Sequence, residues 1–219
     1  DITPAPTSTG TKQYDFGSAE GILANTTYYY WGTATNTYST TKGVSSNYTT
    51  FTTDAAPSAP SVITQSESSL TSTSFTANIN ITADNGASIT GAGIWMGTNN
   101  TAYNASGNTF YSISTTTTGV KSLNFTNLSG STNYYYWGSA TNSAGTTVSS
   151  AYETVTTPAQ AYPYNNMYYN ANDAYYACIS STSQTYYSTS STFGAGIVLY
   201  TDVTLTTLVS DGYYARDNY

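Results

Sequence analysis

Residues 22–36 read ILANTTYYYWGTATN, and residues 128–142 read LSGSTNYYYWGSATN. Equivalent residues in the two stretches lie 106 positions apart, as the pair Tyr28 and Tyr134 shows. A repeat distance of this length corresponds to one small β domain and is longer than the repeats of solenoid proteins. The two stretches therefore predict two successive copies of one domain.

The later stretch has the alternation of a β-strand, whose side chains point in turn to opposite faces. Every second residue from Leu128 to Asn142 is expected to face a core, and the residues between them, including Tyr135 and Trp137, are expected to face outward. Residues 142–145, Asn-Ser-Ala-Gly, supply turn chemistry. Residues 146–157 are then expected to return as another strand, and residues 43–53 do the same in the first copy.

The composition favours an all-β protein. Thr and Ser make up about a third of the 219 residues, and 24 Tyr and 3 Trp stand in for scarce aliphatic residues. Thr, Tyr and Trp favour strands, and aromatic rings bury a large apolar area. Scarce aliphatic residues would indicate disorder only together with a high net charge, and the net charge here is -7.

The pattern that runs from Leu128 through Tyr134 and Tyr136 to Gly145 resembles the penultimate strand and last hairpin of fibronectin type III domains. It is most similar to the bacterial versions in surface proteins of Bacteroidota and in bacteriophage virion proteins. Residues 74–81, 89–97 and 121–128 resemble earlier strands of that family. The resemblance implies a β-sandwich. The usual Trp of the second strand is absent, and Phe75 or Ile79 takes its place.

The resemblance divides the chain into tandem parts. Residues 61–157 are expected to form a complete fibronectin type III-like sandwich, after a linker at residues 54–60 that its prolines stiffen. Residues 1–53 match the second copy only from about Val120 onward and are expected to be the C-terminal part of an incomplete domain. Since half a sandwich exposes its inner face, we expect the native polypeptide to continue before Asp1, or a neighbouring chain to complete the sheet.

Residues 158–219 are predicted to form a small Tyr-rich β module, because they hold 12 of the 24 tyrosines. Residues 193–214 resemble a module at the ends of Bacteroidota surface proteins and phage fibre proteins. A strand is expected at Ile197–Tyr200, a second element at Thr204–Leu208 and a tight turn at Asp211–Gly212. The single Cys178 is either buried and inert or separated from its partner.

Several classes of function are excluded by the residue types. The chain has no His and one Cys, which excludes imidazole catalysis and His- or thiolate-based metal sites. Four basic residues do not neutralise a nucleic-acid backbone, and no apolar run is long enough to insert into a membrane. The carboxylates lie in no recognisable catalytic motif, so we expect no enzyme and no cofactor. Two interpretations of Asp202, Asp211 and Asp217 stay open: they bind calcium, or they have turn and capping roles.

Outward aromatic residues are the candidate contact surface. Exposed rings stack on sugars or pack on neighbouring chains, although they also shield the face of a sheet. In the C-terminal module the tyrosines either form a contact surface or replace Leu in the core. The candidate residues are Tyr29, Trp31, Tyr135, Trp137, Tyr168, Tyr169, Tyr175 and Tyr176.

These features together predict a non-enzymatic structural and adhesive protein of an extracellular fibre or appendage. We expect a bacteriophage virion fibre component that acts as a spacer and a surface-contact module. The expected partners are other copies of the chain or neighbouring virion or filament proteins, and a cell-surface glycan or receptor. A bacterial cell-surface adhesin or filament subunit is the alternative, and an accessory carbohydrate-binding region of a secreted enzyme is another.

Overall fold

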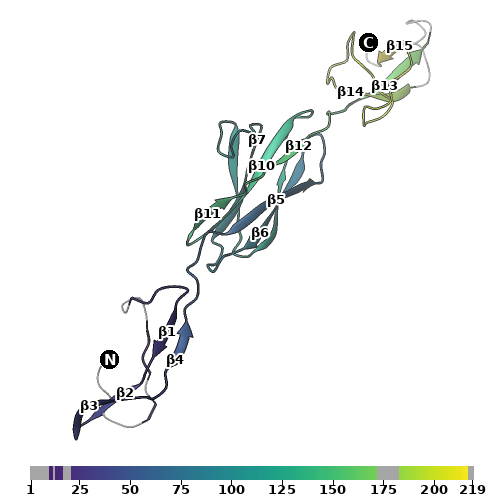
Figure 1. Cartoon of the computed structure of the whole chain (residues 1–219). Coiled ribbons are helices and arrows are strands. Elements are labelled where there is room, and N and C mark those ends of the chain that lie inside the picture. The colour runs from purple at the N-terminus through teal and green to yellow at the C-terminus, as the bar shows by residue number, and fades with distance from the viewer. Residues whose placement is uncertain (1–9, 12, 17–20, 172–182, 217–219) are drawn as a thin grey trace. The chain divides into compact units, whose positions relative to one another are not determined.

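The computed structural model describes residues 10–11, 13–16, 21–171 and 183–216, and all regular secondary structure in them is β-strand (Figure 1). The chain divides into two compact units, Asp1–Ser58 and Ala59–Tyr219. The all-β prediction is therefore confirmed. Most of the described core lies in the second unit, between residues 62 and 155.

The second unit contains a sandwich of two antiparallel sheets. One sheet has three strands in the order β5-β6-β9, and the other has β11-β10-β7-β8, with β12 also paired to β10. This distribution of strands over two facing sheets is that of a fibronectin type III-like, Ig-like β-sandwich. The strands are β5 (Ser61–Ser68), β6 (Phe75–Ala83), β7 (Gly91–Gly97), β8 (Asn108–Ile113), β9 (Gly119–Phe125), β10 (Asn133–Asn142), β11 (Gly145–Val148) and β12 (Glu153–Thr156).

The core of the sandwich shows the alternating burial of β-strands. Phe75, Ala77, Ile79 and Ile81 of β6 are each at most 1% exposed. The ring of Phe75 packs 5.6 Å from that of Phe125 and also contacts tyrosines of β10. An aromatic centre of this kind buries a large area with few side chains, which suits a chain poor in Leu and Val.

The strand β10 begins at Asn133, so the predicted strand was five residues too long at its start. The segment before it is held as a corner, because the backbone N–H of Ser129 donates to the hydroxyl of Tyr134 at 3.0 Å. Ser131 has a positive φ of 51°, which is incompatible with an extended strand. A tyrosine whose hydroxyl bonds backbone a few residues upstream is a known corner of such sandwiches.

The single strand predicted for residues 146–157 is interrupted. These residues form two short strands, β11 and β12. Between them the hydroxyl of Ser149 accepts from the N–H of Gly138 at 3.0 Å and donates to the carbonyl of Ala151 at 3.0 Å. The N–H of Gly138 thus bonds a side chain and not a backbone carbonyl of the returning segment. This lets the backbone turn away from β10 after β11.

The first unit carries the same ribbon in a shorter form. There β1 (Thr27–Tyr30) pairs with β4 (Thr49–Thr52), and β2 (Thr33–Asn36) pairs with β3 (Ser39–Val44). The corner recurs, with the N–H of Leu23 donating to the Tyr28 hydroxyl at 2.6 Å. Gly32 N–H donates to the Ser45 hydroxyl at 3.2 Å, as Gly138 does to Ser149. Both stretches are thus the same structural element.

The C-terminal sheet has the order β14-β13-β15, from β13 (Tyr162–Asn170), β14 (Ser183–Ser188) and β15 (Tyr213–Arg216). Tyr164 and Tyr186 are buried in its core with Met167 and Leu199, so tyrosine does act as a core residue here. The predicted strand Ile197–Tyr200 is wrong, since only Tyr200 joins a ladder, through single bridges to residues 187 and 208. Cys178 lies outside the described residues.

Candidate contact surface

The outer face of the five-stranded sheet carries a row of contacting aromatic side chains. Trp95 of β7 and Trp137 of β10 are paired in register. The Trp137 ring lies 5.0 Å from that of Tyr152, and the Trp95 ring lies 5.2 Å from that of Phe110. We call this set the outer aromatic row; its members are Tyr103, Phe110, Trp95, Trp137, Tyr135 and Tyr152.

Packing within the row decides which rings reach solvent. Trp137 points outward as predicted, but it is only 5% exposed, because its neighbours cover it. The exposed rings are those of Phe110, Tyr152 and Tyr103. The sequence argument missed these three, since it assigned no strand to residues 98–118 and gave no reason for Tyr152 to fold back over the sheet.

In the first unit the equivalent aromatic residues keep their packing and remain exposed. Tyr48 packs against both Tyr29 and Trp31, with ring centroids 5.2 Å and 5.7 Å apart, as Tyr152 does in the second copy. Tyr29 and Trp31 are 55% and 51% exposed. The difference follows from the neighbours, because Trp137 lies beside β7 and nothing equivalent to β7 is described next to β1 and β2.

The inner face of the first unit is open as well. Tyr30 is 42% exposed, whereas its equivalent Tyr136 is fully buried. A Cβ added to Gly32 would meet no atom within 4 Å, whereas one added to Gly138 would lie 2.8 Å from Ile79. Phe16 gives partial cover by stacking on Phe51, with ring centroids 5.9 Å apart. Residues 13–16 form no strand. The predicted match of the first copy to the second, from about Val120 onward, aligns them with β9 (Gly119–Phe125).

Among the C-terminal tyrosines predicted as contact residues, Tyr169 packs and bonds within its own module. The hydroxyl of Tyr169 donates to the carbonyl of Asp211 at 3.0 Å, and its ring lies 5.0 Å from that of Tyr214. Burial and the neighbouring tyrosines raise the pKa of Tyr214 to about 12. Tyr168 is partly buried. The other two predicted contact residues, Tyr175 and Tyr176, lie outside the described residues.

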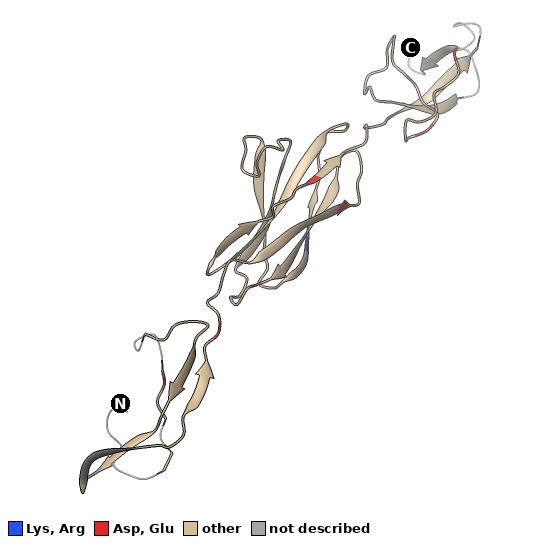
Figure 2. Ribbon diagram, viewed as in Figure 1, with Lys and Arg blue, Asp and Glu red and all other residues tan. Residues whose placement is uncertain are grey.

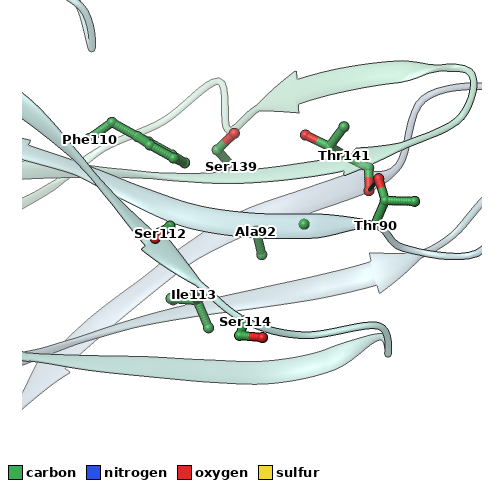
Figure 3. Close-up of a pocket in the computed structure, with 9 residues that line it drawn as sticks. Thr90, Ala92, Phe110, Ser112, Ile113, Ser114, Ser139 and Thr141 are labelled. Carbon is green, nitrogen blue, oxygen red and sulfur yellow. Dashed lines mark hydrogen bonds between the residues drawn. The ribbon is translucent and has the colours of Figure 1, made fainter.

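A shallow hollow of about 380 Å³ lies beside Phe110 on the same outer face (Figure 3). Its floor is the backbone of β7 at Gly91, where an added Cβ would meet no atom within 4 Å. Phe110 lies over Gly93 and bounds the hollow on one side. Hydroxyl side chains surround it, from β8 and the residue after it, from β10 and from the segment before β7: Ser112, Ser114, Ser139, Thr141 and Thr90.

Charged residues are sparse along the described ribbon (Figure 2), and they form no cluster suited to a metal there. The carboxylate of Asp202 is used within its own loop, where it accepts from the hydroxyl of Thr204 and from the N–H groups of Thr206 and Thr207. These bonds hold the pKa of Asp202 below its ordinary range. A carboxylate that accepts bonds from three residues of its own loop acts as a cap for that loop.

Within the described part of the chain, no helix has the length and apolar character to cross a membrane. Figure 1 shows strands throughout that part.

The chain is similar to known proteins in three-dimensional structure, and no sequence family matches it. No family profile and no curated protein matches the chain. Among solved structures, the FN1-FN3 domains of chicken CNTN1 are similar at 22% identity and a TM-score of 0.35, over 64% of this chain and 45% of that one. Domains A168-A170 from titin are similar at 21% identity and a TM-score of 0.34, over 64% of this chain and 44% of that one. The chain thus spans less than half of either structure.

Proposed function

We propose that this chain is a non-enzymatic spacer and contact module of an extracellular fibre or appendage. The observation that carries the proposal is the repetition of one ribbon, down to its hydrogen bonds, in two successive units. Serial copies of a small β domain lengthen a protein without adding a catalytic centre, and each copy carries the same aromatic ribbon.

Contact by such a module depends on hydroxyl and aromatic groups. Charged residues are 7% of the chain, so attraction of partners over long distances is weak. Short-range stacking on exposed rings, together with hydrogen bonds to Ser and Thr, supplies the binding energy instead. The partners that fit are neighbouring copies, other proteins of the same fibre, and a glycan or receptor on a cell surface.

We place this appendage on a bacteriophage virion, where the resemblance of residues 128–145 to virion domains is the supporting observation. The test is immunogold electron microscopy with antibodies raised against residues 59–157, applied to phage particles and to the bacterial cells that produce them. Gold on tail or head fibres is the expected result. Gold confined to the cell surface would replace the virion location with that of a bacterial adhesin or filament.

A further inference from the structure

The hollow on the outer face of the sandwich combines a bare stretch of backbone with hydroxyl side chains on both sides. The middle strand of three, β7, has no side chain at Gly91, while its neighbours β8 and β10 carry hydroxyl residues on the same face. Neighbouring strands lie about 4.8 Å apart, so the two hydroxyl rows stand about 10 Å from each other. The bare backbone of β7 at Gly91 lies between these two rows.

Ser139 brings to this site a hydroxyl that no described residue bonds. Ser139 is 3% exposed, and its hydroxyl makes no hydrogen bond to any described residue. The oxygen is not sealed from solvent, and it lies on the side of the sheet that carries Phe110 (Figure 3). Because this oxygen reaches solvent at the hollow and no described residue bonds it, it is available to a ligand seated there.

The other hydroxyls at the hollow keep free capacity. The Thr90 hydroxyl donates to the carbonyl of Thr141 at 3.3 Å, and the hydroxyls of Thr141 and Thr146 are 2.8 Å apart. Since each hydroxyl donates one bond and accepts up to two, these groups still accept bonds from a ligand. Phe110 adds an exposed apolar ring at the edge. The residues that line the hollow include no charged side chain.

We propose that this hollow is a binding site for one ring of a neutral saccharide. A pyranose ring offers hydroxyls around its edge for Ser139 and the threonines, and an apolar C–H face for Phe110. Anionic sugars are disfavoured, because no cationic side chain lines the site. The proposal rests on the contact role proposed above, and it does not depend on which particle or cell carries the chain.

The experiment is a titration of the intact 219-residue protein with galactose, glucose, mannose and N-acetylglucosamine, followed by amide chemical shifts in NMR. At millimolar sugar, the amides of residues 90–93, 112–114 and 139–141 are expected to shift with at least one sugar. The fitted Kd is then compared among variants. No shift in these residues with any of the four sugars overturns the proposal.

Two variants and a matched control separate binding from folding. Gly91→Val fills the floor of the hollow at a position where an added Cβ meets no atom within 4 Å, and is expected to abolish the shifts while the sandwich stays folded. Ser139→Ala removes a hydroxyl that no described residue binds, and is expected to weaken sugar binding about two- to tenfold without loss of stability. Ser143→Ala, at an exposed serine in a turn, is expected to change neither.

The outcome of the variants is decisive in both directions. Shifts that persist unchanged in Gly91→Val would place the sugar elsewhere and overturn the assignment. Immunogold failure with intact sugar binding would overturn only the virion location, so the two proposals fail separately.

Discussion

At the scale of the residue, Tyr136 shows how one side chain holds both sheets. It is fully buried, and its hydroxyl donates to the carbonyl of Gln65 at 2.5 Å, joining β10 to β5. Tyr136→Phe keeps the ring and leaves that carbonyl unsatisfied, so we expect a loss of about 1–3 kcal/mol in the free energy of unfolding. Chemical denaturation of the two proteins measures it. An unchanged midpoint would mean that water replaces the hydroxyl at no cost.

The same residue predicts an alkaline limit to stability. Burial raises the pKa of Tyr136 above its ordinary value, and Glu153 and Glu67 act in the same direction. A folded pKa above the unfolded one gives stability that is complete below the unfolded pKa, about 10 for tyrosine, and is lost as pH rises toward the folded value. Unfolding free energy measured upward from neutral pH should therefore fall above that point, and fall less steeply in Tyr136→Phe.

Asp202 predicts the opposite limit in the C-terminal module. Its pKa is lowered by hydrogen bonds, of which the bond from Thr204 is the largest cause. The stability it gives is present above the unfolded pKa, about 3.9 for aspartate, and is lost as pH falls through the lower folded value. An NMR titration of the Asp202 carboxyl carbon should show a midpoint well below that of an ordinary aspartate. A midpoint at the ordinary value would contradict the loop-capping role.

At the scale of the element, the two copies of the ribbon offer a matched pair of glycines. A Cβ at Gly138 would lie 2.8 Å from Ile79 and 3.2 Å from Val62, whereas one at Gly32 would meet nothing within 4 Å. Gly138→Ala should cost about 1–3 kcal/mol through overpacking, seen as a lower Tm. Gly32→Ala should change Tm little. A large loss in Gly32→Ala would instead show that something covers the inner face of the first unit in solution.

At the scale of the whole molecule, the two units should differ in stability. The first unit lacks strands that cover either face of its ribbon among the described residues, and Tyr30 and Trp31 stay exposed. Hydrogen exchange in the intact chain should therefore be orders of magnitude faster at the amides of β1 and β4 than at those of β10 and β12. Equal protection in both ribbons would contradict this expectation.

The repeat and the alternation of residues 22–36 and 128–142 were enough to predict an all-β fold, two copies of one ribbon, and the inward set of Tyr134, Tyr136 and Ala140. These features are local, because period-two burial and turn chemistry depend only on neighbouring residues. The sequence did not predict the burial of Trp137, the free hydroxyl of Ser139 or the hollow over Gly91. Those depend on which side chains β7, β8 and the Tyr152 segment bring to the same face, and such contacts between distant residues arise only when the sheets assemble.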